Sequence, residues 1–162
     1  MGKYFKKFYV GESKIHNKGI FAEKNIRRGE VVGVIQGQKK FKVNRNLNDA
    51  LSNPDWVGFE PHYWVDPIPP YKHLNHSCNP NVAILGTKTL IALKSIKKNH
   101  EITIDYSIIE ADPRWYMKCV CGGKNCRGII KSIRQLPKDV YNKYKPFISK
   151  HFQALYQKNG NG

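Results

Sequence analysis

Residues 75–81 read Asn-His-Ser-Cys-Asn-Pro-Asn, and the cysteine among them, Cys78, decides how the chain must fold. The other three cysteines stand together in Cys119-Val-Cys121-Gly-Gly-Lys-Asn-Cys126. The two sulfurs of a Cys-x-Cys unit can turn toward one ion, and four thiolates around one ion are typical of structural zinc. The sequence therefore predicts a zinc site formed by Cys78, Cys119, Cys121 and Cys126, which folds residues near 120 back against residue 78.

Other states of the four cysteines are open, namely disulfides in three pairings or free thiols. Lys3, Lys6 and Lys7 stand at the N-terminus with no apolar stretch after them, so a signal peptide is not indicated. No apolar run is long enough to cross a bilayer. We therefore expect the cytosol or the nucleus, where disulfides are rare, and no membrane contact.

The charge of the chain favours a polyanionic partner. The 162 residues include 28 Lys+Arg and 12 Asp+Glu, a formal net charge of +16. Such an excess favours non-specific contact with nucleic acid, although a charged surface can also serve solubility alone. Residues 49–112 hold eight of the 12 acids and five of the 28 basic residues. This middle region could attract a basic peptide while the basic flanks hold a polyanion.

Short apolar runs separated by glycines predict a mainly β protein of one-domain size. We expect strands at 6–10, 19–22, 31–36, 58–66, 82–85, 89–93 and 101–106. Residues 44–52 could form a helix, and 137–156 carry an amphipathic helical pattern that Pro146 interrupts. Strands that do not alternate with helices favour several small sheets over a doubly wound fold. We find no internal repeat.

Four motifs resemble those of the SET-domain protein-lysine methyltransferases. Residues 75–81 resemble the NHSCxPN motif, and residues 101–106 (Glu-Ile-Thr-Ile-Asp-Tyr) resemble the ELTxDY motif. Residues 119–128 resemble the post-SET zinc module, and residues 17–22 (Asn-Lys-Gly-Ile-Phe-Ala) resemble the opening cofactor loop. The motifs occur in family order. Residues 115–130, followed by Leu136 and Pro137, are most similar to compact stand-alone SET proteins of microbial type.

The resemblance implies a mainly β SET fold, with small curved sheets around a C-terminal pseudoknot, a post-SET zinc site and a short helical C-terminus. Its parts would be a SET domain at 1–112, a post-SET segment at 113–130 and a helical extension at 131–162. Threading of this kind is rare among folds. It would place residues 75–78 beside residues 101–106.

The resemblance also implies methyl transfer from S-adenosylmethionine to the side-chain amine of a protein lysine. The cofactor-binding residues would be Lys18, Gly19, Ile20, Lys72, Asn75, His76 and Tyr106. The backbone at 18–20 would hold the methionine part of the cofactor. Lys72 stands where many relatives have an arginine that faces the carboxylate of the cofactor, and a lysine can pair with this carboxylate as a point charge but cannot form the two parallel hydrogen bonds of an arginine. Because four cysteines complete the zinc site, His76 is left without a ligand role.

Tyr106 is the expected catalytic residue. The nucleophile must be a neutral amine, and presenting that form of a free lysine at neutral pH costs about 4–5 kcal/mol. An apolar channel and a nearby sulfonium both disfavour the ammonium. The Tyr106 hydroxyl would then orient the lone pair of the amine, so that alignment and electrostatics supply most of the acceleration.

Three positions depart from the family pattern. Asn17 replaces the first glycine of the cofactor loop, and asparagine tolerates a positive φ. Ile35 and Ile104 stand where relatives place aromatic residues that line the lysine channel or limit the number of methyl groups. An apolar isoleucine cannot hold the water that opposes further methylation, so we expect di- or trimethylation.

The expected substrate is a protein with a basic, lysine-containing segment, such as a histone, a ribosomal protein or a small chromatin protein of a microbe. A microbial effector would act in the nucleus of its host. Two other hypotheses are a zinc-stabilised nucleic-acid-binding protein without catalysis and a SET fold kept as a binding scaffold. The first lacks a recognisable binding module, and the intact Asn75, His76 and Tyr106 argue against the second.

Overall fold

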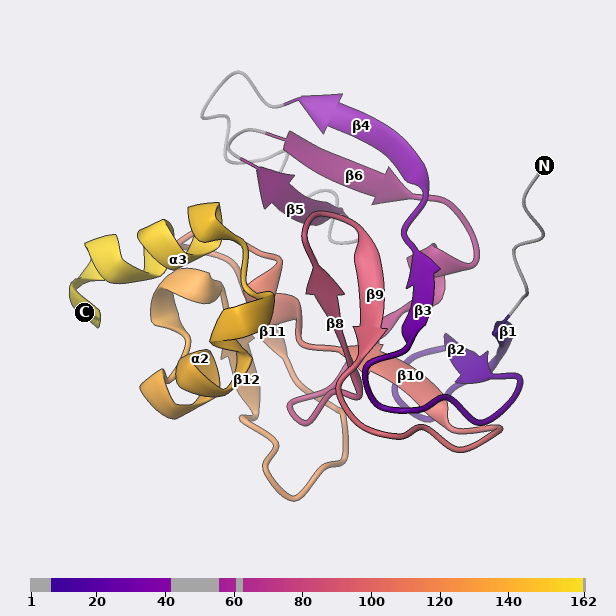
Figure 1. Cartoon of the computed structure of the whole chain (residues 1–162). Coiled ribbons are helices and arrows are strands. Elements are labelled where there is room, and N and C mark those ends of the chain that lie inside the picture. The colour runs from indigo at the N-terminus through magenta and orange to yellow at the C-terminus, as the bar shows by residue number, and fades with distance from the viewer. Residues whose placement is uncertain (1–6, 42–55, 61–62, 162) are drawn as a thin grey trace.

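Four small sheets and a C-terminal helical layer form the fold of this computed structural model, which describes residues 7–41, 56–60 and 63–161 (Figure 1). The first sheet has the order β1-β2-β10-β7, with β1 at Phe8–Glu12, β2 at Lys18–Ala22, β10 at Glu101–Ile104 and β7 at Asn75–His76. The second has the order β3-β9-β8, with β3 at Val31–Val34, β9 at Thr89–Ala92 and β8 at Val82–Leu85.

In Figure 1 one of the other two sheets lies at the top and the other lies beside the C-terminal helices. One has the order β4-β6-β5, with β4 at Gly37–Phe41, β6 at Tyr63–Pro67 and β5 at Val57–Glu60. The other is the hairpin of β11 (Tyr116–Lys118) and β12 (Ile129–Lys131), which is followed in the chain by the helices.

Helices α2 (Lys138–Tyr144) and α3 (Lys150–Tyr156) follow the predicted amphipathic pattern. Pro146 lacks a backbone N–H, and a short 3-10 turn at Lys145–Phe147 separates the two helices. Ser149 caps α3 by accepting a hydrogen bond from the Phe152 N–H at 3.2 Å. The helices bury their aromatic faces, and the rings of Tyr141 and Tyr156 stack with centroids 3.7 Å apart.

One hydrophobic core joins the sheets to the helices. Its buried members include Ile20 and Ile102 from the first sheet, Leu90 from the second, and Phe152 and Tyr156 from α3. A smaller cluster of Trp115, Cys119 and Ile130 packs beside Tyr106 and Cys78. Among the described residues, no helix combines the length and the apolar character needed to span a membrane.

The structure confirms the mainly β fold and corrects several element boundaries. The run at 58–66, predicted as one strand, is two antiparallel strands, β5 and β6, and Pro61 is the sequence signal that could have divided it. Strands β4, β7, β11 and β12 were not predicted, because each has only two to five residues and no clear alternation of polar and apolar residues. The helix predicted at 44–52 lies outside the described residues.

Candidate active site and metal centre

Parallel pairing of β7 with β10 brings the two best-matched motifs together. Thr103 pairs with Asn75 and Ile104 with His76, and the Ser77 N–H donates to the Ile104 carbonyl at 2.9 Å. The 75–81 and 101–106 segments therefore lie side by side, as the family fold implied.

Asn75 locks the start of β2 to this junction. Its side-chain Nδ2 lies 2.9 Å from the Lys18 carbonyl, 2.8 Å from Glu101 Oε1 and 3.1 Å from Ser13 Oγ. Ser13 Oγ also donates to Glu101 Oε1 at 2.8 Å. The carboxylate of Glu101 therefore has a structural role, and the Asn75 amide nitrogen is bound within the protein.

The cofactor loop keeps its turn despite the departure at its first position. Asn17 has a φ of 38°, the left-handed conformation that asparagine tolerates. Gly19 is required for a reason that the sequence did not reveal, because a Cβ atom there would stand 2.3 Å from Glu101 Oε1. Lys18 and Gly19 pair with β1, whereas Ile20 is buried and pairs with Val10 on one side and Ile102 on the other.

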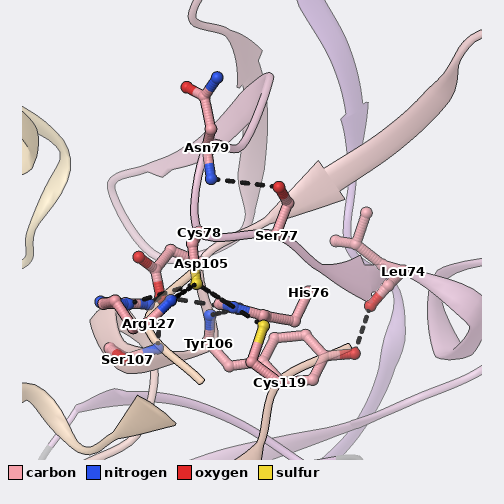
Figure 2. A network of polar contacts seen from close by, with 10 residues as sticks. All are labelled: Leu74, His76, Ser77, Cys78, Asn79, Asp105, Tyr106, Ser107, Cys119 and Arg127. Atoms are coloured by element: carbon pink, nitrogen blue, oxygen red, sulfur yellow. Dashed lines mark hydrogen bonds and ion pairs between the residues drawn. The ribbon is translucent and has the colours of Figure 1, made fainter. Parts of the chain in front are cut away.

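His76 is neutral and fully engaged. The Tyr106 N–H donates to Nδ1 at 3.1 Å, so the ring proton resides on Nε2, which lies 3.3 Å from Cys78 Sγ (Figure 2). Burial lowers the pKa of His76 to about 4; Arg127 adds to this shift and Asp105 opposes it. His76 therefore orders the backbone of the tyrosine and donates to a cysteine sulfur.

Tyr106 points into a small pocket from the end of β10. Its hydroxyl donates to the Leu74 carbonyl at 2.7 Å (Figure 2), and its ring lies 5.4 Å from that of His76, centroid to centroid. The pocket has a cavity volume of about 40 Å³. It is lined by Ile35, Trp56, Val57, Pro67, Tyr71, Lys72, Leu74, Ile104, Tyr106, Ile109, Glu110 and Trp115.

Three predicted positions meet in this pocket. Ile35 and Ile104, the two isoleucines at aromatic positions of the family, are both buried in its wall, and Lys72 also lines it. Trp115 was missed as a pocket residue. Only its place just before the cysteine array could have indicated that it folds back with the array.

The four predicted cysteines form one cluster. Their Sγ atoms all lie within 4.8 Å of one another, and those of Cys78 and Cys119 are 3.6 Å apart. Four ligands about 2.3 Å from one zinc ion would stand about 3.8 Å from each other, so the donor set and its spacing fit tetrahedral zinc. Disulfides are not formed, since all four cysteines are free.

The thiols of the cluster differ in acidity. Burial raises the pKa of Cys119, with the three neighbouring thiols adding to the effect. Burial opposes ionisation of Cys121 as well, but backbone hydrogen bonds at Cys78 and Gly123 lower its pKa to about 7. A group of thiols that already favours one thiolate is a suitable ligand set for a dication.

Arg127 connects the cysteine cluster to Asp105, which directly follows β10, and sequence reasoning gave it no role. Its Nη2 donates to Asp105 Oδ1 at 2.6 Å, while its backbone N–H and Nε donate to Cys78 Sγ at 3.3 and 3.4 Å (Figure 2). Asp105 is fully buried and also accepts from the Ser107 N–H at 3.0 Å. The Asp105–Arg127 pair therefore fixes the segment before Tyr106 against the post-SET segment.

Two curated relatives are named as histone-lysine methyltransferases. A stretch of 135 residues is 27% identical to the Emericella nidulans "Histone-lysine N-methyltransferase, H3 lysine-4 specific", covering 73% of this chain and 11% of that protein. A stretch of 141 residues is 30% identical to Homo sapiens "Histone-lysine N-methyltransferase SETD1B", covering 77% of this chain and 7% of that protein. The chain thus spans about a tenth of the length of these curated relatives.

A solved structure and a family model identify the fold. The crystal structure of KRYPTONITE in complex with mCHG DNA and SAH matches with a TM-score of 0.59 and 21% identity, covering 75% of this chain and 28% of that one. The SET domain model matches residues 17–107, more than half of the chain. Since this match contains both the β7–β10 junction and Tyr106, the chain belongs to the SET domain family.

Proposed function

We propose that the protein is an S-adenosylmethionine-dependent methyltransferase that methylates a lysine side chain in a histone or in another basic, nucleic-acid-associated protein. The observation that carries this proposal is the Tyr106 hydroxyl, held at 2.7 Å from the Leu74 carbonyl in a pocket whose wall is mostly apolar and includes the charged residues Lys72 and Glu110. The names of the relatives support the reaction and the substrate class. The same names support action in the nucleus, on chromatin.

The pocket is suited to a neutral amine. Ile35, Val57, Ile104 and Ile109 are buried in its wall, and such walls disfavour an ammonium ion, which lowers the pKa of an inserted lysine. The Tyr106 hydroxyl donates its hydrogen to the Leu74 carbonyl, so toward an inserted amine its oxygen can act only as a hydrogen-bond acceptor. A hydrogen bond from the amine to this oxygen would orient the nitrogen lone pair, and this alignment is the proposed catalytic contribution of the residue.

The residues proposed to hold the cofactor surround the same junction. S-adenosylmethionine supplies an electrophilic methyl group when bound, and KRYPTONITE was solved with SAH. We assign its contacts to Lys18, Gly19, Ile20, Lys72, Asn75, His76 and Tyr106. Asn75 and His76 would use main-chain atoms, because the side-chain nitrogens of both are bound within the protein. The donor chemistry fits, because Lys72 brings a cation to the pocket for a carboxylate, and the bonds of Asn75 fix the backbone of β2 in place.

We assign a structural zinc ion to Cys78, Cys119, Cys121 and Cys126, whose spacing fits it. The ion would tie the post-SET segment to the strand that precedes Tyr106, with Arg127 as a second tie. Zinc bound by four thiolates has no open coordination position, so its role is to hold Trp115 in the wall of the pocket.

The experiment is transfer of labelled methyl groups to core histones and to a basic fraction of cell extract, with wild type beside Tyr106→Phe. We expect label on lysine in the wild type and a fall in kcat of about 10²-fold or more in the variant. Phenylalanine keeps the ring beside His76, so cofactor binding and thermal stability should change little.

Two outcomes would contradict the proposal. Equal rates for wild type and Tyr106→Phe would remove the tyrosine from the mechanism. Absence of both label and cofactor binding, together with salt-sensitive binding to nucleic acid, would favour the zinc-stabilised nucleic-acid-binding protein instead.

A further inference from the structure

Two turns of the chain are near copies of one another, although no repeat was found by inspection of the sequence. Residues 24–29 read Lys-Asn-Ile-Arg-Arg-Gly, and residues 94–99 read Lys-Ser-Ile-Lys-Lys-Asn. Each stretch ends on a residue with positive φ, 83° at Gly29 and 62° at Asn99. Each also closes with the same bond, from Glu30 N–H to the Arg27 carbonyl and from His100 N–H to the Lys97 carbonyl, both at 3.1 Å. We call the segments 23–30 and 93–100 the twin turns.

The twin turns lie side by side. Ile26 and Ile96 are buried and exchange two backbone hydrogen bonds of 2.8 Å in an antiparallel bridge. Their flanks match as well, since Gly29 N–H donates to the Ala92 carbonyl as Asn99 N–H donates to the Ala22 carbonyl, both at 2.8 Å. An approximate two-fold axis therefore passes through the bridge. Figure 1 shows these connections running from β2 to β3 and from β9 to β10.

This symmetry gathers cations on one surface. Because Ile26 and Ile96 point inward, the residues beside them point outward. The twin turns therefore expose six basic side chains to solvent and contain only two acidic residues, Glu23 and Glu30. The six are Lys24, Arg27, Arg28, Lys94, Lys97 and Lys98. Within the described part of the chain, Arg27, Arg28, Lys97 and Lys98 take part in no ion pair.

We propose that the twin turns bind the phosphate backbone of duplex DNA that accompanies the substrate protein, an inference that rests on the proposed function. A basic substrate segment would be repelled by this surface, whereas phosphates would be attracted, so it faces the polyanion and not the substrate. The exposed side chains of the twin turns are all polar or charged. A stable protein interface would require apolar or aromatic anchors here, which phosphate contacts do not need.

The surface is placed to act beside the pocket without covering it. Turn 93–100 leads directly into β10, and the five residue steps from Glu101 to Tyr106 span about 17 Å in extended form. DNA held on the twin turns would therefore raise the local concentration of a DNA-bound substrate. It would leave the pocket open to a flexible segment of that substrate.

The test compares two variants with equal loss of charge. One carries Arg27→Gln, Arg28→Gln, Lys97→Gln and Lys98→Gln. The control carries Lys138→Gln, Lys145→Gln, Lys150→Gln and Lys158→Gln, four exposed lysines of the C-terminal helical region. The probes are a random-sequence duplex DNA at several salt concentrations, a free histone and a nucleosome.

We expect the twin-turn variant to reduce the slope of log Kd against log salt by about 3 to 4, because each phosphate contact contributes about 0.9. Methylation of the nucleosome should fall at least tenfold relative to methylation of the free histone, which should keep its rate. The control variant should retain most of the slope and the nucleosome rate.

Equal slopes for the two variants would overturn the proposal. So would a loss of binding to anionic vesicles that exceeds the loss of binding to DNA. The DNA measurement needs no methyl transfer, so a reduced slope in a protein that labels no substrate would uphold the surface while refuting the proposed activity.

Discussion

Ile104 forms part of the wall of the Tyr106 pocket, and its side chain is only 1% exposed. We predict that Ile104→Tyr lowers the number of methyl groups added per lysine, because the larger side chain and its hydroxyl take up space and hold water where a methylated amine must turn. Mass spectrometry of the product measures the shift toward monomethyllysine. The control Ile104→Val should keep the wild-type distribution, and a wild type that makes only monomethyllysine would refute the argument.

Arg127 and Asp105 form a buried ion pair whose loss should unfold the centre of the molecule. We predict that Arg127→Ala lowers the free energy of unfolding by about 3–5 kcal/mol, because it leaves a fully buried carboxylate without its cation. The matched control is Arg114→Ala, which removes an exposed partner of Asp112 at 3.8 Å and should change little. Denaturant titration compares the two, and equal effects would contradict the structural role of Arg127.

At the residue scale, the sequence indicated the candidate site residues but not the residues that hold them in place. The motifs placed Tyr106 and the four cysteines, and the structure brings Ile35 and Ile104 into the same pocket as the tyrosine. The carbonyl of Leu74 and the side chain of Arg127 carried no signal of their own. Their roles depend on partners 32 and 22 residues away, which only the fold brings near.

At the element scale, the β11–β12 hairpin has little core of its own. Its cluster contains three buried residues, Trp115, Cys119 and Ile130, so the proposed zinc ion would supply much of its stability. We predict that a zinc chelator releases this segment, with faster hydrogen exchange over 115–131 and loss of methyl transfer. Added zinc should restore both, and purified protein without one zinc per chain would contradict the prediction.

Elements with a local signal were predicted, and elements defined by pairing were not. The run at 82–85 is β8, and the interrupted helix at 137–156 is α2 and α3, because apolar spacing and Pro146 are visible in the sequence. The two residues of β7 carry no strand pattern and exist through their parallel partner, β10. The twin turns have similar structures but few identical residues, because lysine replaces arginine and asparagine replaces glycine at equivalent positions.

At the scale of the whole molecule, the three expected parts, 1–112, 113–130 and 131–162, pack against one another. Ile133, Tyr144 and Phe152, from the helical extension, belong to the same core as Ile20 and the other residues of the sheets. The post-SET cluster packs on Tyr106 and Cys78, which belong to the first part. We therefore propose that residues 131–162 complete the SET fold and do not fold apart from it.

Phe152 offers the test of this proposal. It is 3% exposed, and a Cβ atom added to Gly58 in β5 would lie 3.1 Å from its ring. We predict that Phe152→Ala destabilises the whole domain by about 3–5 kcal/mol, which lowers Tm by about 10 °C in one cooperative transition. The control Tyr116→Ala, at a ring-bearing residue that is 70% exposed, should leave Tm nearly unchanged. Two separate transitions in Phe152→Ala would mean that the helices fold independently, whereas a single transition means that the pocket beside Val57 depends on them.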